Sequence, residues 1–165
     1  MYGKLRKITL MAIGLVVAVT LQSCEDNSNL PVTPGIEFKS LDKFSSVSTG
    51  IDSLVLTFSF EDGDGDIGFP ESDTSSRDIF VKLFEKQNGI FVPVVFTDTL
   101  LFTYRMPYLE PTGNNSSLKG EVIISYLGYL IGVPNDTVRY EVYIRDRAGH
   151  TSNTITTSEV VTTVQ

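Results

Sequence analysis

Four carboxylates fall within six residues in the segment Glu61–Gly68, which reads Glu-Asp-Gly-Asp-Gly-Asp-Ile-Gly. Like charges a few ångströms apart repel each other by about 1 kcal/mol per pair in water, and by more near a protein surface. A cation among the oxygens would relieve that repulsion in a compact loop. Aspartate supplies hard oxygen ligands, and glycine permits the tight turns that aim them inward. The segment therefore predicts a calcium site with Asp62, Asp64 and Asp66 as ligands.

The acidic segment is not an EF-hand. In that motif glycine occupies the sixth position, whereas the sixth position counted from Asp62 is Ile67, and no amphipathic helices flank the loop. A second interpretation stays open, in which the segment is an exposed hairpin tip with solvated charges, or in which the aspartates cap their own backbone.

The residue arrangements typical of enzymes do not accompany the acidic segment. His150 is the sole histidine, no Gly-x-Ser-x-Gly sequence marks a nucleophile, and there is no phosphate-binding glycine loop or His/Cys metal cluster. Paired catalytic carboxylates usually come from different elements that flank a cleft, not from one short loop. The sequence therefore predicts a noncatalytic protein.

The chain beyond residue 35 has a hydrophobic period of two. In residues 54–60 and 138–145, apolar residues expected to point inward alternate with residues expected on the opposite face, as in a strand with one buried face. Turn sequences separate further segments rich in β-branched and aromatic residues, and these are also expected to be strands: 36–40, 79–86, 90–96, 100–105, 120–126 and 154–163. Seven or eight short strands in about 130 residues predict an all-β, antiparallel sandwich.

Two segments near the C-terminus resemble those of immunoglobulin and fibronectin type III domains. Residues 134–144 are similar to the sixth strand of such domains, with Tyr140 in the place of a tyrosine whose hydroxyl closes a corner; a plain strand tyrosine is the alternative. Residues 145–153 (Arg-Asp-Arg-Ala-Gly-His-Thr-Ser-Asn) look like the turn that joins the last two strands in bacterial immunoglobulin-like modules, with His150 where Asn is usual. The resemblance implies an immunoglobulin-like domain over residues 36–165.

This fold class makes a prediction about the acidic segment. In an immunoglobulin-like sandwich, the loop after the second strand and the loop between the last two strands emerge at the same end. We therefore expect Asp146 to face Asp62, Asp64 and Asp66 and to serve as a fourth calcium ligand.

The first 24 residues are typical of an exported lipoprotein. A head of three basic residues precedes residues 8–21, an uncharged, largely apolar run of 14 residues. Such a run suits a signal peptide but falls short of the roughly 20 residues of a membrane-spanning helix. The following Leu-Gln-Ser-Cys (residues 21–24) resembles the lipobox of bacterial lipoproteins, although Gln22 replaces the small residue usual there.

The resemblance implies cleavage of the signal peptide (residues 1–23) and a covalent lipid with palmitate-type acyl chains on Cys24. Cys24 is the only cysteine, so no disulfide forms within the chain, and lipidation explains a single thiol at this place. An ordinary secretory signal is the alternative, but it would want small residues at both the −1 and −3 positions. Two or three acyl chains hold a protein to a membrane firmly, whereas one holds it only marginally.

The mature chain is strongly acidic. After loss of three of the 13 basic residues with residues 1–23, 10 basic and 20 acidic residues remain, a net charge of −10. Such a surface repels phosphate backbones and excludes nucleic acid as a partner. Residues 24–35, polar with two prolines and a glycine, predict a linker. Its Glu25 and Asp26 resemble the surface-export signal of Bacteroidota lipoproteins; an acidic linker without such a role is the alternative.

We therefore expect a cell-envelope lipoprotein of the outer membrane, on its periplasmic or surface-exposed face, which acts as an adhesion, scaffold or accessory binding module. Residues 60–68 look like a segment of uncharacterised Bacteroidota lipoproteins, which carries no assigned activity. A protein or a glycan would be the partner, and Tyr143 is the surface candidate because it shares the outward parity of Arg139, Glu141 and Arg145. The alternatives are a carbohydrate-binding accessory of an outer-membrane glycan-uptake system and a periplasmic hydrolase subunit.

Overall fold

A computed structural model of the chain describes residues 30–45, 52–95, 102–110, 116–127 and 137–162. The predicted signal peptide and Cys24 lie outside these ranges. The described residues form strands and loops without a helix, so the predicted all-β class is confirmed. Within these ranges no helix is long and apolar enough to cross a membrane.

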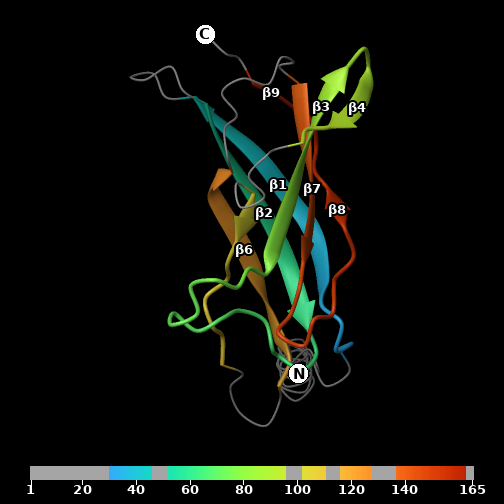
Figure 1. The fold of residues 1–165 in the computed structure, drawn as a ribbon. Coiled ribbons are helices and arrows are strands. Elements are labelled where there is room, and N and C mark those ends of the chain that lie inside the picture. The colour runs from blue at the N-terminus through green and yellow to red at the C-terminus, as the bar shows by residue number, and fades with distance from the viewer. Residues whose placement is uncertain (1–29, 46–51, 96–101, 111–115, 128–136, 163–165) are drawn as a thin grey trace, which may run out of the picture.

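Two antiparallel sheets make up the sandwich (Figure 1). One sheet has the order β1-β2-β6, and the other has the order β4-β3-β7-β8, with β5 paired to β3 and β9 paired to β7. The bounds of the strands are β1 Gly35–Ser45, β2 Asp52–Asp62, β3 Ile79–Gln87, β4 Ile90–Pro93, β5 Thr103–Tyr104, β6 Leu118–Leu127, β7 Thr137–Ile144, β8 Ile155–Thr156 and β9 Val160–Val161.

The core lies between the two sheets and follows the predicted alternation. The inward positions of β2 and β7 are almost fully buried, and they are Leu54, Leu56, Phe58, Phe60, Val138, Tyr140, Val142 and Ile144. Burial of an apolar side chain of this size contributes about 1.5–3 kcal/mol, so these two strands form the stable centre of the domain. Asp62 is the last residue of β2 and Asp146 lies two residues beyond β7, so a rigid support positions both.

The last predicted strand, 154–163, is interrupted. It forms two short strands, β8 and β9, and Thr157 lies between them. The Tyr140 amide donates to Thr157 Oγ1 (3.0 Å), and the Thr157 amide donates to the Tyr140 carbonyl (2.9 Å). A side-chain hydroxyl therefore replaces a backbone acceptor at this point, and the regular ladder stops.

The end of the predicted linker packs against the sandwich. Pro34 is buried, and the Pro31 carbonyl accepts a hydrogen bond from the Gly63 amide (2.9 Å). The Asn153 side chain then binds both the amide and the carbonyl of Ile36, each at 2.9 Å, as a neighbouring strand would. The described chain therefore begins at the same end of the sandwich as the acidic loop and the turn after β7 (Figure 1).

Candidate metal centre

Four carboxylates meet at one end of the sandwich. Asp62 is the last residue of β2, Asp64 and Asp66 lie in the loop that follows, and Asp146 lies two residues after β7. One oxygen from each of the four lies within 4.8 Å of the other three. The structure thus brings together the four residues that the fold class placed at a common end.

Asp62 is fully buried, and among the described residues only one of its oxygens has a hydrogen-bond partner. The Asp66 amide donates to Asp62 Oδ2 (2.9 Å), which closes the turn between the two residues. Burial, followed by repulsion from Asp64, raises the pKa of Asp62 to about 6. A buried carboxylate held beside other carboxylates is unfavourable unless a positive charge joins it.

Three buried oxygens of the loop have no hydrogen-bond partner among the described residues: the Oδ1 atoms of Asp62, Asp64 and Asp66. The second oxygen of Asp66 accepts from the Ala148 amide (2.9 Å), and burial, followed by the charge of Asp146, raises the Asp66 pKa. Buried polar atoms in native proteins are nearly always paired. The capping interpretation explains Asp62 Oδ2 and Asp66 Oδ2, but it leaves all three Oδ1 atoms unexplained.

His150 orients the fourth carboxylate. Its amide donates to Asp146 Oδ1 (2.7 Å), and its Nδ1 lies 2.8 Å from Asp146 Oδ2. The hydrogen bond and the charge of Asp146 raise the pKa of His150. The imidazole is 41% exposed. Its contact with Asp146 gives it a supporting role that composition alone could not reveal.

Arg147 holds the acidic loop from outside. Its guanidinium donates to the carbonyls of Ile67 (3.1 Å) and Gly68 (2.7 Å), and its backbone amide donates to the Asp66 carbonyl (3.2 Å). The Ile67 side chain is fully buried and anchors the loop in the core. The guanidinium also lies over the ring of Tyr108, 4.9 Å from its centroid. The loop is therefore fixed in position even though it carries four acidic groups.

Gly68 is required at the end of this loop. Its φ of +83° lies in the left-handed region, and a Cβ built there would lie 2.1 Å from the Pro107 carbonyl oxygen. Any side chain would thus both strain the backbone and collide with the neighbouring segment. The glycines of the acidic segment serve close packing as well as turning.

The donor set determines which ions the cluster can hold. All four groups are carboxylates, which are hard oxygen ligands, and the cluster contains no imidazole nitrogen or thiolate. Such sites suit calcium, magnesium or manganese rather than zinc or copper. The arrangement can bind a hard cation.

Tyr143 lies on the outer face of β7, as predicted, and is half-buried. Its ring stacks on that of Phe80 at 4.9 Å between centroids, and Lys82 Nζ lies 5.9 Å from the Tyr143 centroid. The ring therefore takes part in contacts across the sheet. Its role in binding a partner stays a prediction.

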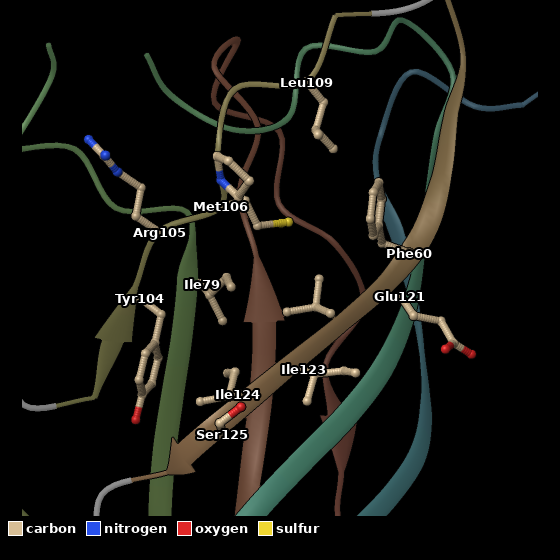
Figure 2. Close-up of a pocket in the computed structure, with 12 residues that line it drawn as sticks. Phe60, Ile79, Tyr104, Arg105, Met106, Leu109, Glu121, Ile123, Ile124 and Ser125 are labelled. Atoms are coloured by element: carbon tan, nitrogen blue, oxygen red, sulfur yellow. The ribbon is translucent and has the colours of Figure 1, made fainter. Parts of the chain in front are cut away.

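A cleft of about 510 Å³ opens on another side of the sandwich, between β6 and residues 104–109 (Figure 2). Ile79, Met106 and Ile124 lie around its centre, whereas the side chains of Arg105 and Glu121 point away from it (Figure 2). None of the four clustered aspartates lines it. The cleft is an apolar hollow, distinct from the acidic cluster.

Asp78 is a buried carboxylate that sequence analysis did not single out. Its Oδ1 accepts from the Met106 amide (2.9 Å), while its Oδ2 is buried without a hydrogen-bond partner in the described ranges. Burial raises its pKa to about 6. Asp78 lies outside the acidic cluster, and no other His, Cys, Asp or Glu of the described ranges joins it to complete a metal site.

Comparisons of the chain with known protein families, with curated proteins and with solved structures found no match in any of the three.

Proposed function

We propose that this chain is a noncatalytic, lipid-anchored module of the bacterial cell envelope, and that a calcium ion braces its β-sandwich. Asp62, Asp64, Asp66 and Asp146 hold the ion. The lipid on Cys24 attaches the module to the outer membrane, where it serves as an adhesion, scaffold or accessory binding unit.

One observation carries the calcium proposal: three buried Oδ1 atoms of one short loop have no hydrogen-bond partner among the described residues. An acidic cluster on an exposed tip would leave its oxygens in water, but Asp62 is fully buried. Desolvation of this carboxylate is offset only if a cation or a proton joins it. A divalent cation neutralises two of the four charges and supplies a partner for every unpaired oxygen.

Calcium is favoured over magnesium by the character of the ligands. Calcium accepts six to eight oxygens in flexible geometry, whereas magnesium demands a near-ideal octahedron and retains several waters. Four carboxylates from two separate loops, with both backbones held by hydrogen bonds, suit the more adaptable ion. We expect calcium to bind more tightly than magnesium.

Isothermal titration of the full chain, after treatment with a chelator, tests the proposal. We expect heat on addition of calcium and a rise in melting temperature, because ligand at 100 times Kd stabilises the folded state by about 2.7 kcal/mol. The Asp64→Asn variant should lose both effects. The matched control is Asp42→Asn, which removes an exposed carboxylate on β1 whose partner is Ser40 Oγ.

The absence of heat and of any thermal shift in millimolar calcium would overturn the calcium proposal. The anchor is tested separately by mass spectrometry of the native protein. We expect a mature chain that begins at Cys24 and carries acyl chains.

A further inference from the structure

Residues 30 and 31, at the end of the predicted linker, lie directly on the acidic loop that contains Asp62, Asp64 and Asp66. The Gly63 amide, between Asp62 and Asp64, donates to the Pro31 carbonyl (2.9 Å). A Cβ built on Gly63 would lie 2.2 Å from the Leu30 carbonyl oxygen and 2.6 Å from the Pro31 carbonyl oxygen. Only a residue without a side chain allows this approach. The loop also holds Ser116, whose hydroxyl donates to the Gly63 carbonyl (3.2 Å).

We propose that the cation site is a clamp on the tether, by which we mean residues 24–31 between the lipidated cysteine and the acidic loop. Calcium bound by the loop locks residues 30–31 against the sandwich, and loss of calcium releases them. This inference rests on the proposed calcium site and adds a regulated role to it. The clamp sets whether residues 30–31 are held against the sandwich. It therefore controls how freely the domain moves relative to its point of attachment.

Repulsion between the three aspartates of the acidic loop and Asp146 of the turn after β7 provides the physical coupling. Without a cation, four carboxylates with oxygens within 4.8 Å of one another favour an open turn. Gly63 lies inside that turn, so opening separates its amide from the Pro31 carbonyl. With calcium bound, opening must first expel the ion, so the closed and docked state becomes more populated.

The maximum extended length of the tether limits how far the domain can lie from the lipidated residue. The six steps from Cys24 to Leu30 span at most about 20 Å when fully extended. With residues 30–31 docked, the acidic end of the sandwich must stay within that distance of the lipidated residue. Release of the segment lengthens the tether, and the strongly acidic domain can then move further from an anionic surface.

Hydrogen exchange at the Gly63 amide directly measures how often its hydrogen bond to the Pro31 carbonyl opens. The full chain is measured by NMR with a chelator and then with calcium. If opening of the turn requires loss of the ion, exchange at Gly63 slows by about 1 + [Ca²⁺]/Kd, which is about tenfold at ten times Kd. The reference is the Gly89 amide, in the β3–β4 turn at the other end of the sandwich, whose exchange should not change (Figure 1).

A pair of glycine variants tests the reciprocal effect. Gly63→Ala places a methyl group against the Leu30 backbone and displaces the segment, so calcium affinity should fall by at least about fivefold, because coupling between two events is mutual. Gly35→Ala is the matched control, since a Cβ there meets nothing within 4 Å, and its calcium Kd should stay within about twofold of the wild type.

The outcomes separate the two proposals. Calcium binding by titration without slower exchange at Gly63 overturns the clamp and leaves the site intact. Equal calcium affinities for the Gly63→Ala and Gly35→Ala variants also overturn it. If Gly63→Ala does not fold, the exchange measurement on the wild type decides alone. Absence of calcium binding overturns the proposed function and the clamp together.

Discussion

Replacement of Asp62 by asparagine should stabilise the calcium-free protein. Burial and the charge of Asp64 raise the pKa of Asp62 from 3.8 to about 6, which corresponds to about 3 kcal/mol at neutral pH. Screening by solvent around its less buried neighbours reduces this to about 1–2 kcal/mol. Asparagine keeps the oxygen that accepts from the Asp66 amide and places a donor where the unpaired Oδ1 stands.

The size of the stability gain depends on pH, and its sign depends on calcium. A carboxyl whose folded pKa is raised contributes stability that is present below pH 3.8 and lost as pH rises through about 6. In chelator, the stability gain from Asp62→Asn should therefore vanish near pH 4 and be complete above about pH 7. In calcium at 100 times Kd the order reverses, because the wild type gains about 2.7 kcal/mol and the variant gains little.

Urea unfolding curves of the two proteins measure these differences, in chelator and in calcium, at several pH values. Asp42→Asn is the control, and it should track the wild type in both solutions. If Asp62→Asn is less stable than the wild type in chelator, or gains as much from calcium, the account of the buried carboxylate is wrong.

Three other predictions follow from the fold and the N-terminal sequence. Gly68→Ala should lower the free energy of unfolding in urea by about 3 kcal/mol or more, since it combines a left-handed φ with a backbone collision. Gly89→Ala, with the same φ in open space, should lower it by about 1 kcal/mol, and equal losses would refute the collision. Thr157→Val should cost about 1–3 kcal/mol by leaving the Tyr140 amide unpaired, and an unchanged midpoint would contradict this. Cys24→Ala should abolish incorporation of labelled palmitate, and continued labelling would refute lipidation at that thiol.

Much of the fold was predictable because a buried face imposes a period of two. The alternation in residues 54–60 and 138–145 predicted β2 and β7, whose bounds are Asp52–Asp62 and Thr137–Ile144. The break in the last strand was not predictable. It depends on a hydroxyl of Thr157 that accepts from a residue 17 positions away, and periodicity carries no information about such a pairing.

The candidate site was predictable in its ligands but not in its supports. Spacing identified the three loop aspartates, and the fold class brought Asp146 to them, because both loops leave the same end of a sandwich. The supports depend on tertiary contacts: His150 binds Asp146, Arg147 holds two loop carbonyls, and Pro31 meets Gly63. Asp146 and His150 share the turn of residues 145–153, but neither that turn nor any other motif specifies these contacts, so only the folded chain reveals them.

A crystal structure of the full chain grown with calcium tests the central claim most directly. We predict an ion at about 2.3–2.6 Å from an oxygen of each of Asp62, Asp64, Asp66 and Asp146, with residues 30–31 docked on the loop beside it. Density for water alone among these carboxylates at saturating calcium, or an ion bound elsewhere while the four oxygens move apart, would contradict the claim.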